Sequence, residues 1–562
     1  MMDIDAQVSL WQDKVTDPEL AAQLEELVSS GDAQALQDAF YRELEFGTAG
    51  LRGVIGVGSN RMNRYTVGKA TQGLADHLNS LPGDGKSVAI AHDPRIKSDF
   101  FTEVAACILA ANGIRACVYP RLQPTPALSF AVRELGCDAG INITASHNPK
   151  EYNGYKVYGS DGCQITTNVA RAIQRAIDDV DLFDDVRTMS YDEARAAGLI
   201  EEIGEEVLDA FIDACAAQSV EPQGTEGPLK VVFTPLNGTG LECVTRILDR
   251  IGITDVVVVP EQRDPDGTFA TCPSPNPEDR RALERGLALC DEVHPDLLVA
   301  TDPDADRVGV AVADGDDYAL LTGNEIGILL FDYLCRMRTE QGIMPQRPFA
   351  TTTIVSTDMV DRIAERYGVE MRRVLTGFKY IGEQITALEP MGEEGRFIFG
   401  FEESYGYLIG PHVRDKDAIA TTMAICQMAR DHRAHGRSLV QAMEALYEEY
   451  GWYENRLVNM RYEGMDGARK MEQIMTTLRS QPPAAFAGRA VTAVVDYQPG
   501  IDGLPPANVI EFQLEGSGKV IIRPSGTEPK VKAYLFGHAD TRESTSAMCA
   551  ALETEVTALL RA

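Results

Sequence analysis

The feature that most constrains the fold is an alternation of helical and strand-like segments that restarts twice along the chain. In the first stretch, apolar spacing predicts helices at 67–81 and 100–112 and short buried strands at 87–91 and 116–119. Such alternation is typical of α/β units with parallel strands. The forty-odd residues before this stretch are predicted to be helical, because leucines recur there at three- to four-residue spacing.

Each restart predicts a further α/β unit. The second has a predicted helix at 207–217 and strands at 229–233 and 297–300. The third starts near Asn324, with helices at 326–338 and 440–450 and a strand at 350–355. The last hundred residues differ, because predicted strands at 490–497, 509–514, 519–522 and 531–535 precede a helix at 544–560. That order indicates a smaller α+β domain.

The length of the chain agrees with this division, since 562 residues exceed what one hydrophobic core supports. We therefore predict an α/β protein with three related units on mixed sheets and a C-terminal α+β domain. The predicted domains are residues 1–206, 207–323, 324–455 and 456–562. Loops that follow strands in such units are the usual places for ligands.

One such loop carries a serine. Ser146 lies in Thr144-Ala145-Ser146-His147-Asn148-Pro149, directly after a strand-like apolar run. A serine hydroxyl needs a nearby base or cation to act as a nucleophile, and Lys156 and Arg52 are the candidates. A turn serine that only caps a helix is the simple structural alternative.

Another loop carries carboxylates at alternate positions, Asp302, Asp304 and Asp306. In an extended loop this spacing places all three on one side, and three hard oxygen ligands suit Mg²⁺. An EF-hand is excluded, because Arg307 and Ala313 stand where it needs Gly and Glu. A functional alternative is that Asp304 is the nucleophile of an aspartyl-phosphate phosphatase. The structural alternative is that the segment is only a solvated acidic turn without a ligand.

Two more segments suit a phosphorylated sugar. The loop from Arg523 to Lys530 offers a guanidinium, hydroxyls and glycine-freed amides, which suit a phosphate dianion. Neighbouring carboxylates and a hydroxyl in Gly400–Gly406 suit vicinal sugar hydroxyls. Lys379 and the cluster His412, Arg414 and Lys416 add positive charge, unless that cluster is only a solvated basic face.

Together these segments resemble a known family, the α-D-phosphohexomutases, which include phosphoglucomutases and phosphomannomutases. The resemblance covers essentially the whole chain and lies in five motifs in order: GTAGLRG (47–53), TASHNPKEYNGYK (144–156), DPDADR (302–307), GFEESYG (400–406) and RPSGTEPK (523–530). The spelling is most similar to the phosphoglucomutase branch, which also includes phosphopentomutases.

The resemblance implies a heart-shaped protein with one loop from each domain at a central cleft. It implies that Ser146 carries a phosphate, that Asp302, Asp304 and Asp306 hold Mg²⁺ against it, and that Arg52 and Lys156 form the acid/base neighbourhood. It also implies substrate contacts from Lys379, Glu402, Ser404, Arg523, Ser525, Gly526 and Thr527. Ala145 and His147 match no role.

The activity implied is interconversion of α-D-glucose 1-phosphate and glucose 6-phosphate through a phosphoserine enzyme, with glucose 1,6-bisphosphate as intermediate and activator. Mannose or pentose phosphates, and formation of a sugar bisphosphate, stay open as alternatives. A non-catalytic sugar-phosphate sensor is the alternative from another class.

The net charge limits which partners the protein can bind, and the cysteine content indicates its cellular compartment. A formal net charge of -33 disfavours nucleic acid and anionic membrane, so any phosphate site must be a local basic pocket. The 11 cysteines form no C-x-x-C pair, which favours a reducing cytoplasm over disulfides or zinc. No apolar run is long enough for a membrane span. We expect a cytoplasmic monomer or homodimer.

Overall fold

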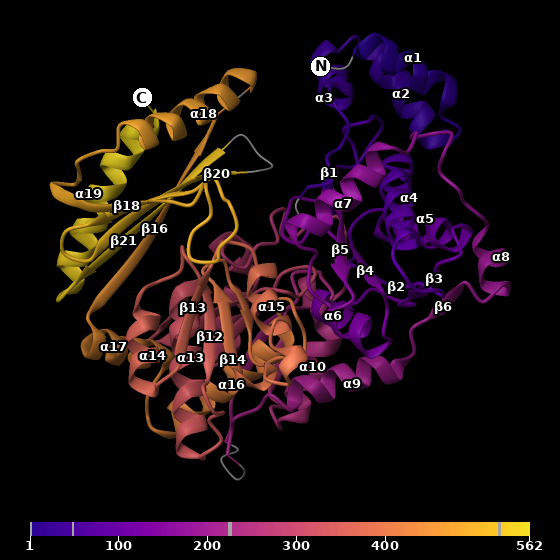
Figure 1. Cartoon of the computed structure of the whole chain (residues 1–562). Helices are drawn as coiled ribbons and strands as arrows, with labels where there is room; N and C mark the ends of the chain where they lie inside the picture. Colours follow the sequence, from indigo (N-terminus) through magenta and orange to yellow (C-terminus); the bar gives the residue numbers. More distant parts are fainter. Residues whose placement is uncertain (1–2, 48–49, 223–226, 463, 526–529, 562) are drawn as a thin grey trace.

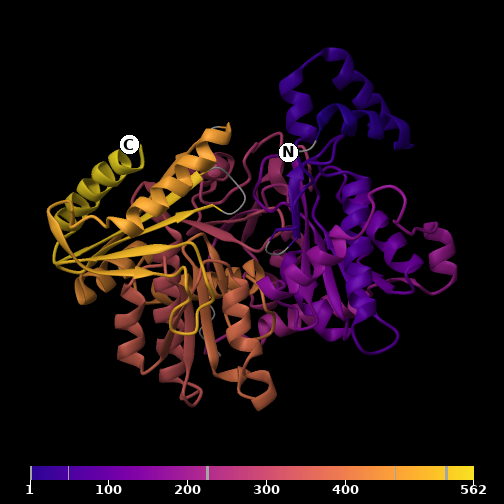
Figure 2. The same ribbon diagram turned by 45° about the horizontal axis from the view of Figure 1, so that its top comes forward.

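The computed structural model describes residues 3–47, 50–222, 227–462, 464–525 and 530–561. Within this part of the chain the strands form four sheets that follow one another in sequence. Figures 1 and 2 show the C-terminal sheet and the N-terminal helices on opposite sides of the molecule, and in Figure 1 the strands β12, β13 and β14 lie below the C-terminal sheet. The predicted order of three α/β units and a different C-terminal unit is confirmed.

The first sheet has the strand order β1-β5-β4-β2-β3-β6. β2 pairs in parallel with β3 and β4, whereas β5 runs antiparallel to β4 and β1, so the sheet is mixed. Its strands are β1 (Gly50–Val54), β2 (Ser87–His92), β3 (Arg115–Val118), β4 (Ala139–Ile143), β5 (Tyr152–Gly159) and β6 (Ile200–Glu202). Its helices are α4 (Arg64–Ser80), α5 (Ser98–Ala111), α6 (Thr125–Glu134), α7 (Thr167–Asp178) and α8 (Tyr191–Ala196).

The N-terminal helical region consists of separate short helices, α1 (Ile4–Lys14), α2 (Pro18–Ser30) and α3 (Ala33–Phe40). Asp17 and Asp32 cap the second and third helices, and Gly31 adopts a left-handed φ of 66° between them. Trp11 is fully buried and packs edge-on against Phe40, with ring centroids 5.6 Å apart. The helices therefore form a small layer with its own apolar contacts.

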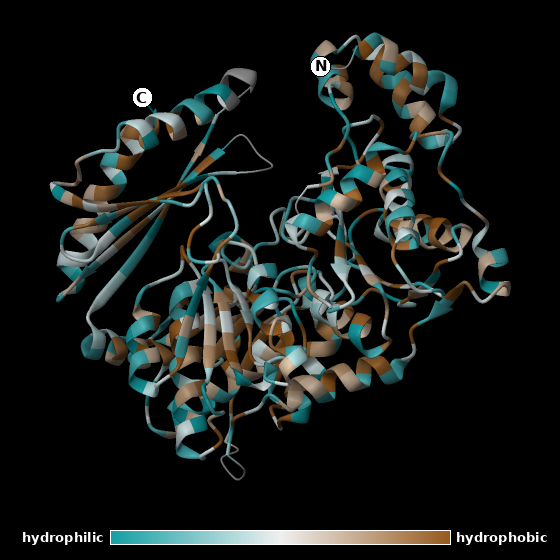
Figure 3. Ribbon diagram, viewed as in Figure 1, coloured by the Kyte–Doolittle hydropathy of each residue, from teal (hydrophilic) through white to brown (hydrophobic). Residues whose placement is uncertain are grey.

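The second sheet has the order β11-β10-β9-β7-β8, with β9 parallel to β7 and antiparallel to β10. Its strands are β7 (Val231–Thr234), β8 (Val256–Val258), β9 (Leu297–Thr301), β10 (Val308–Asp314) and β11 (Asp317–Leu321). The helices of this unit are α9 (Glu205–Ala216), α10 (Gly240–Arg250), α11 (Pro260–Arg263), η1 (Arg280–Leu283) and α12 (Glu284–Val293). In Figure 3 outer helices such as α9 carry both hydrophobic and hydrophilic residues, as expected for one buried face.

The third sheet has the order β13-β12-β14-β15, in which β12 is parallel to β13 and β14. Its strands are β12 (Phe349–Thr353), β13 (Glu370–Val374), β14 (Phe397–Glu402) and β15 (Gly406–Leu408). The helices are α13 (Gly323–Glu340), α14 (Met359–Tyr367), α15 (Lys379–Thr386), η2 (Glu389–Met391), η3 (Glu394–Arg396), α16 (Ala418–Ala434) and α17 (Leu439–Tyr450). The apolar core of this unit is continuous with that of the second unit.

The C-terminal sheet is antiparallel, with the order β16-β21-β20-β19-β18-β17. Its strands are β16 (Trp452–Arg461), β17 (Ala485–Phe486), β18 (Arg489–Asp496), β19 (Ile510–Leu514), β20 (Gly518–Pro524) and β21 (Lys530–Ala539). Helices α18 (Gly464–Ser480) and α19 (Arg542–Arg561) complete the unit. The sequence did not predict β16 or α18, and β16 crosses the predicted boundary between residues 455 and 456.

Most of the described part of the GTAGLRG motif lies in a strand. From Gly50 to Val54 it is strand β1, paired antiparallel with β5. Gly50 has φ 137°, and a Cβ there would lie 1.8 Å from the carbonyl oxygen of Tyr155. The glycine therefore permits close approach of two strands. Residues 48 and 49 lie outside the described part.

Candidate functional site

Ser146 lies in the loop after β4, and its side chain contacts the acidic loop of the second unit. It is 4% exposed, with φ 51°, an unusual value for a residue other than glycine. Its Oγ donates a hydrogen bond of 2.6 Å to Oδ2 of Asp302. The Nδ1 atom of His147 lies 3.1 Å from the same Oγ. The serine is thus held against a carboxylate 156 positions further along the chain.

A buried arginine supports this serine loop. Arg95, at the end of the β2 segment, donates to the carbonyl oxygens of Ser146 and Asn148, and to those of Pro149 at 2.9 Å and Tyr152 at 3.0 Å. Its charge is paired with Asp93 at 3.2 Å, and both side chains are fully buried. The sequence analysis did not assign Arg95 a role, because its partners are backbone carbonyls from a distant segment.

The acidic loop gathers its carboxylates by a turn, not by the extended conformation that the spacing suggested. Ala305 has φ 48°, and Oδ1 of Asp302 accepts hydrogen bonds from the amides of Asp306 and Arg307 at 3.1 and 3.0 Å. One carboxylate oxygen from each of Asp302, Asp304 and Asp306 lies within 4.8 Å of the others. All three residues are buried, which excludes a solvated turn.

Two lysines hold the outer oxygens of this loop. Lys156 Nζ lies 2.8 Å from Oδ2 of Asp304, and Lys416 Nζ lies 3.1 Å from Oδ2 of Asp306. Oδ1 of Asp304 and Oδ1 of Asp306 are buried and have no hydrogen-bond partner among the described residues. Buried carboxylate oxygens are rarely left unpaired, so these two atoms are suited to bind a hard cation.

The charges of this cluster shift one another's pKa values. Burial, with the neighbouring charges of Asp304 and Asp306, raises the pKa of Asp302 well above its usual range. Burial alone would also raise the pKa of Asp304, but Lys156, a hydrogen bond with Asp302 and the charge of Lys416 together hold that pKa below the ordinary value. Burial lowers the pKa of Lys156, but the charges of Asp304 and Asp306 raise it by more, so the net change is an increase. Lys156 is therefore a fixed cation at neutral pH.

A cavity of about 920 Å³ opens beside these loops, and residues from all four units line it. Its cationic lining outnumbers its carboxylates, which agrees with the expected local basic pocket in an acidic molecule. The cationic residues are Arg52, Arg307, Lys379, Arg456, Arg523 and Lys532, and the carboxylates are Glu278, Glu402 and Glu403.

The two candidate acid/base residues take different positions. Arg52 lines the cavity and donates from Nη1 to Oδ1 of Asn148, at 3.1 Å, in the serine loop. Lys156 instead points to Asp304, as described above, and is 8% exposed. Arg52 is thus the one of the two that faces the space where a substrate would lie.

The predicted sugar-binding residues also face the cavity. Glu402 is buried, and its Oε1 accepts a hydrogen bond of 2.7 Å from the amide of Gly377. Ser404 and Lys379 line the same space, and Lys379 is 7% exposed. Burial lowers the pKa of Lys379 from its ordinary value of 10.5, which Glu383 only partly offsets.

The predicted phosphate-binding loop is described only in part. Arg523 lines the cavity, and the amide of Ser525 donates a hydrogen bond of 2.8 Å to the carbonyl of Lys530. Gly526 and Thr527 lie outside the described residues, so their predicted role stays a prediction.

Three residues near the site were not assigned from the sequence. His147 was left without a role, although its place beside Ser146 was a visible signal. Burial and the charges of Arg307 and Arg52 hold its pKa well below the ordinary 6.5, so it is neutral at pH 7. Arg307 lines the cavity and pairs with Glu278 at 2.9 Å.

The sequence indicated Lys416 only as added positive charge. The alternative that it belongs to a solvated basic face is wrong, because Lys416 is 7% exposed.

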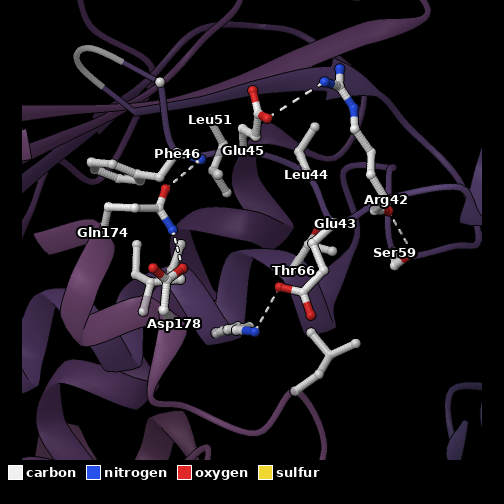
Figure 4. Close-up of a pocket in the computed structure, with 15 residues that line it drawn as sticks. Arg42, Glu43, Leu44, Glu45, Phe46, Leu51, Ser59, Thr66, Gln174 and Asp178 are labelled. Atoms are coloured by element: carbon white, nitrogen blue, oxygen red, sulfur yellow. Dashed lines mark hydrogen bonds and ion pairs between the residues drawn. The ribbon is translucent and has the colours of Figure 1, made fainter. Parts of the chain in front are cut away.

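A second cavity, of about 480 Å³, lies beside α4 and α7 and is drawn in Figure 4. Its polar groups largely bind one another: Lys69 pairs with Glu43 at 2.8 Å, and Gln174 accepts from the amide of Phe46 at 3.1 Å. His147 and Arg307, the sequence neighbours of Ser146 and Asp306, line the larger cavity but not this one. The chemistry therefore belongs to the larger cavity.

Comparison with known proteins gives consistent matches along the chain. Family profiles described as phosphoglucomutase/phosphomannomutase alpha/beta/alpha domains I, II and III match residues 43–183, 209–315 and 322–450. The profile described as the C-terminal domain matches residues 458–552.

Curated relatives agree with these profiles. Phosphoglucomutases of Staphylococcus aureus and Staphylococcus epidermidis are each 37% identical to the chain, over 511 and 513 residues. Each alignment covers 89% of this chain, and 90% and 91% of the respective relative.

Solved structures share the fold. A putative phosphomannomutase from Thermus thermophilus is 24% identical, with a TM-score of 0.69, covering 93% of this chain and 100% of that one. A phosphoglucomutase/phosphomannomutase family protein from Burkholderia thailandensis is 19% identical, with a TM-score of 0.68, covering 92% and 97%.

Four successive domains whose loops meet at one basic cavity, with these relatives, define a phosphosugar mutase, an enzyme that moves a phosphoryl group within a sugar phosphate. The chain belongs to the phosphoglucomutase/phosphomannomutase family.

All 11 cysteines are buried, and none is bonded to another. Among the described helices, none combines the length and the apolar character needed to cross a bilayer.

Proposed function

We propose that the protein interconverts α-D-glucose 1-phosphate and glucose 6-phosphate through a phosphorylated Ser146. The observation that carries this proposal is the 2.6 Å contact between Ser146 Oγ and Asp302 at the edge of a cavity lined by all four domains. The curated relatives at 37% identity are phosphoglucomutases, which supports glucose phosphates as the first choice of substrate.

Mg²⁺ is the proposed metal, and the donor set fits it. The ligands would be Asp302, Asp304 and Asp306 with an oxygen carried by Ser146, all of them hard oxygen donors. The Oδ1 atoms of Asp304 and Asp306, which are buried and accept no hydrogen bond from the described residues, support this assignment. When bound, the cation would neutralise negative charge on the phosphoryl group during transfer.

In the proposed first step, the free hydroxyl of the hexose monophosphate attacks the phosphorus of phospho-Ser146. A bond forms from the sugar oxygen to phosphorus while the bond from phosphorus to Oγ breaks, which yields glucose 1,6-bisphosphate and free Ser146. The sugar hydroxyl loses its proton and the released Oγ of Ser146 takes one up, so the number of protons is unchanged over the step. We assign Arg52 to the acid/base position beside the attacking hydroxyl because Arg52 faces the cavity. Lys156 would hold Asp304 and stabilise charge.

The second step returns the other phosphate of the bisphosphate to Ser146 after the intermediate turns around. Each orientation must place the non-reacting phosphate in the same clamp, for which we propose Arg523, Ser525, Gly526 and Thr527. Glu402 and Ser404 would bind sugar hydroxyls, and Lys379 would add positive charge. In this step the bisphosphate donates a phosphoryl group to free Ser146. Added glucose 1,6-bisphosphate would therefore restore any enzyme that has lost its phosphate.

The experiment that tests this proposal is a substrate panel at fixed Mg²⁺ with a catalytic amount of the matching bisphosphate. We expect the largest kcat/KM with glucose 1-phosphate, and smaller values with mannose 1-phosphate and ribose 1-phosphate. A preference for mannose or ribose would reassign the enzyme to phosphomannomutase or phosphopentomutase activity. Net accumulation of bisphosphate, with release of an equal amount of free sugar from the donor monophosphate, would identify a phosphotransferase. Binding without turnover would identify a sensor.

We also propose a cytoplasmic location and a monomeric or homodimeric state. The buried free thiols are compatible with a reducing compartment. Light scattering on the purified protein would measure its mass and test the proposed assembly state.

A further inference from the structure

Lys416 lies at the meeting point of three domains, although it does not line the substrate cavity. Its ammonium lies 3.1 Å from Oδ2 of Asp306 and 3.0 Å from Oδ1 of Asp415. A buried lysine with two carboxylate partners is held in one position, because leaving either charge unpaired is costly.

Neighbouring atoms fix the backbone around Lys416 from both sides. The amide of Ala418 donates a hydrogen bond of 3.3 Å to the carbonyl of Ala305, in the middle of the acidic loop. Oδ2 of Asp415 accepts from Tyr158 at 2.9 Å and from Gln164 at 3.1 Å, both from the first domain. The ammonium of Lys416 therefore has little freedom to move away from Asp306.

The two outer aspartates of the acidic loop are held in matching ways. Oδ2 of Asp304 accepts from Lys156 and from Thr125 at 2.8 and 3.0 Å, both in the first domain. Oδ2 of Asp306 is held by Lys416, from the third domain, at 3.1 Å, and Lys156 lies farther from it at 3.6 Å. In each carboxylate the bound Oδ2 leaves Oδ1 as a buried oxygen with no hydrogen-bond partner among the described residues, and Nε of Arg307 lies 3.9 Å from Oδ1 of Asp306. The two lysines thereby determine which oxygen of each carboxylate is available to a cation.

Lys416 also contacts the loop proposed to bind the sugar. A Cβ placed on Gly406, in the GFEESYG motif, would lie 2.2 Å from Cδ of Lys416, so the lysine stem passes directly over this glycine. The loops themselves are joined, because the amide of Val308 donates a hydrogen bond of 3.1 Å to the carbonyl of Tyr405. The ammonium of Lys416 lies 5.4 Å from the centre of the Phe378 ring, beside Lys379.

We propose that Lys416 is a positioning residue that aims Asp306 at the metal and ties the metal-binding loop to the sugar-binding loop. It touches neither the cavity nor the reacting atoms, so it acts through Asp306. The inference rests on the proposed function for the identity of the metal loop, and its test is designed to be independent of sugar turnover.

The first measurement is the affinity of the substrate-free protein for Mn²⁺, a spectroscopic substitute for Mg²⁺, by electron paramagnetic resonance. Lys416→Met removes the nearer of the two ammonium groups at Oδ2 of Asp306 and should weaken Mn²⁺ binding about tenfold, as for other residues that orient metal ligands. Lys416→Arg keeps a cation there and should recover part of the loss. In turnover assays, Lys416→Met should lower kcat about ten- to a hundredfold and change KM less than about threefold.

The matched control is Lys69→Met. Lys69 is equally buried, at 9% exposed, and pairs with Glu43 at 2.8 Å, but Glu43 lies outside the acidic loop. Lys69→Met should lose less thermal stability than Lys416→Met, because Glu43 is half exposed whereas Asp306 is buried. Only the variant at position 416 should lose Mn²⁺ affinity.

A second variant tests the same contact without removing the charge. Gly406→Ala adds a methyl group where the stem of Lys416 lies, and the φ of Gly406 is outside the left-handed region, so the clash is the main effect. Gly406→Ala should reproduce the loss of Mn²⁺ affinity. Combined with Lys416→Met it should add little, because both changes remove one interaction.

Unchanged or tighter Mn²⁺ binding in Lys416→Met would overturn the proposal, as would an equal loss in Lys69→Met. Additive effects of the two variants would overturn the proposed role of the lysine stem over Gly406. If the wild-type protein binds Mn²⁺ but does not convert glucose phosphates, the proposed function fails while the role of Lys416 is still measured.

Discussion

Lys379 offers the clearest pH test at the scale of single residues. Burial lowers its pKa below 10.5, and only the protonated ammonium attracts a phosphate dianion. As pH rises through this lowered pKa the charge is lost, so KM for the sugar phosphate should rise by up to about tenfold per pH unit. The rise should begin at a lower pH than an ordinary lysine would give.

The control for that prediction is Lys379→Arg, which stays charged across the range because the pKa of arginine exceeds about 12. Its KM should rise less between pH 8 and about pH 10 than that of the wild type. An equal alkaline rise in both proteins would show that another group is responsible.

Single residues also show where sequence reasoning succeeded and where it stopped. The sequence predicted that the serine loop and the acidic loop meet, and the structure places Ser146 Oγ against the cluster of Asp302, Asp304 and Asp306. This prediction was possible because short motifs that follow strands can be recognised from the local sequence. Lys416 has no such local signal, since its role depends on a contact between residues 110 positions apart. Burial of Lys416 is a property of the assembled domains.

At the scale of elements, the serine loop depends on the charge pair at the end of β2. Arg95→Met would remove four hydrogen bonds to loop carbonyls and leave Asp93 as a buried charge without its ion partner. Breaking such a pair typically costs about 3–5 kcal/mol. We expect the free energy of unfolding, from urea titration, to fall by about that amount.

Arg115→Met is the matched control, because Arg115 pairs with Glu201 at 3.4 Å with both side chains about half exposed, at 44% and 50%. Its cost should be below about 1 kcal/mol. If Arg95→Met were no more destabilising than this control, Arg95 would not be holding the loop.

Elements with a clear apolar period were predictable, and those without one were not. Strands such as β9 and helices such as α13 carry long apolar faces that sequence patterns reveal. β16 contains Glu454, Arg456 and Asn459 and is only partly buried, so its strand character comes from its pairing with β21. The same reason explains β1, whose glycine-rich sequence becomes a strand beside β5.

At the scale of the whole molecule, added salt should act in opposite directions on stability and on substrate binding. The net charge of -33 destabilises the compact state by self-repulsion, so added salt should raise the melting temperature. Salt also screens the basic cavity from an anionic substrate, so KM should rise over the same range. Both follow from a Debye length of about 8 Å at physiological salt, which isolates the cavity from the distant surface.

Measurements from 20 mM to about 300 mM NaCl would check both trends. A KM that falls with salt would mean that repulsion by the whole acidic surface dominates over the cavity. Repeating the series with potassium chloride would separate ionic strength from specific sodium effects.

The central claim is that Ser146 carries the phosphoryl group, and transfer of label from glucose 1,6-bisphosphate measures this directly. Incubation with bisphosphate labelled with radioactive phosphorus, followed by acid quench, digestion and peptide mapping, should place acid-stable label on Ser146 in the wild type and none in Ser146→Ala, which should also lose mutase activity. Acid-labile label on Asp304, or full isomerising activity in Ser146→Ala, would contradict the account.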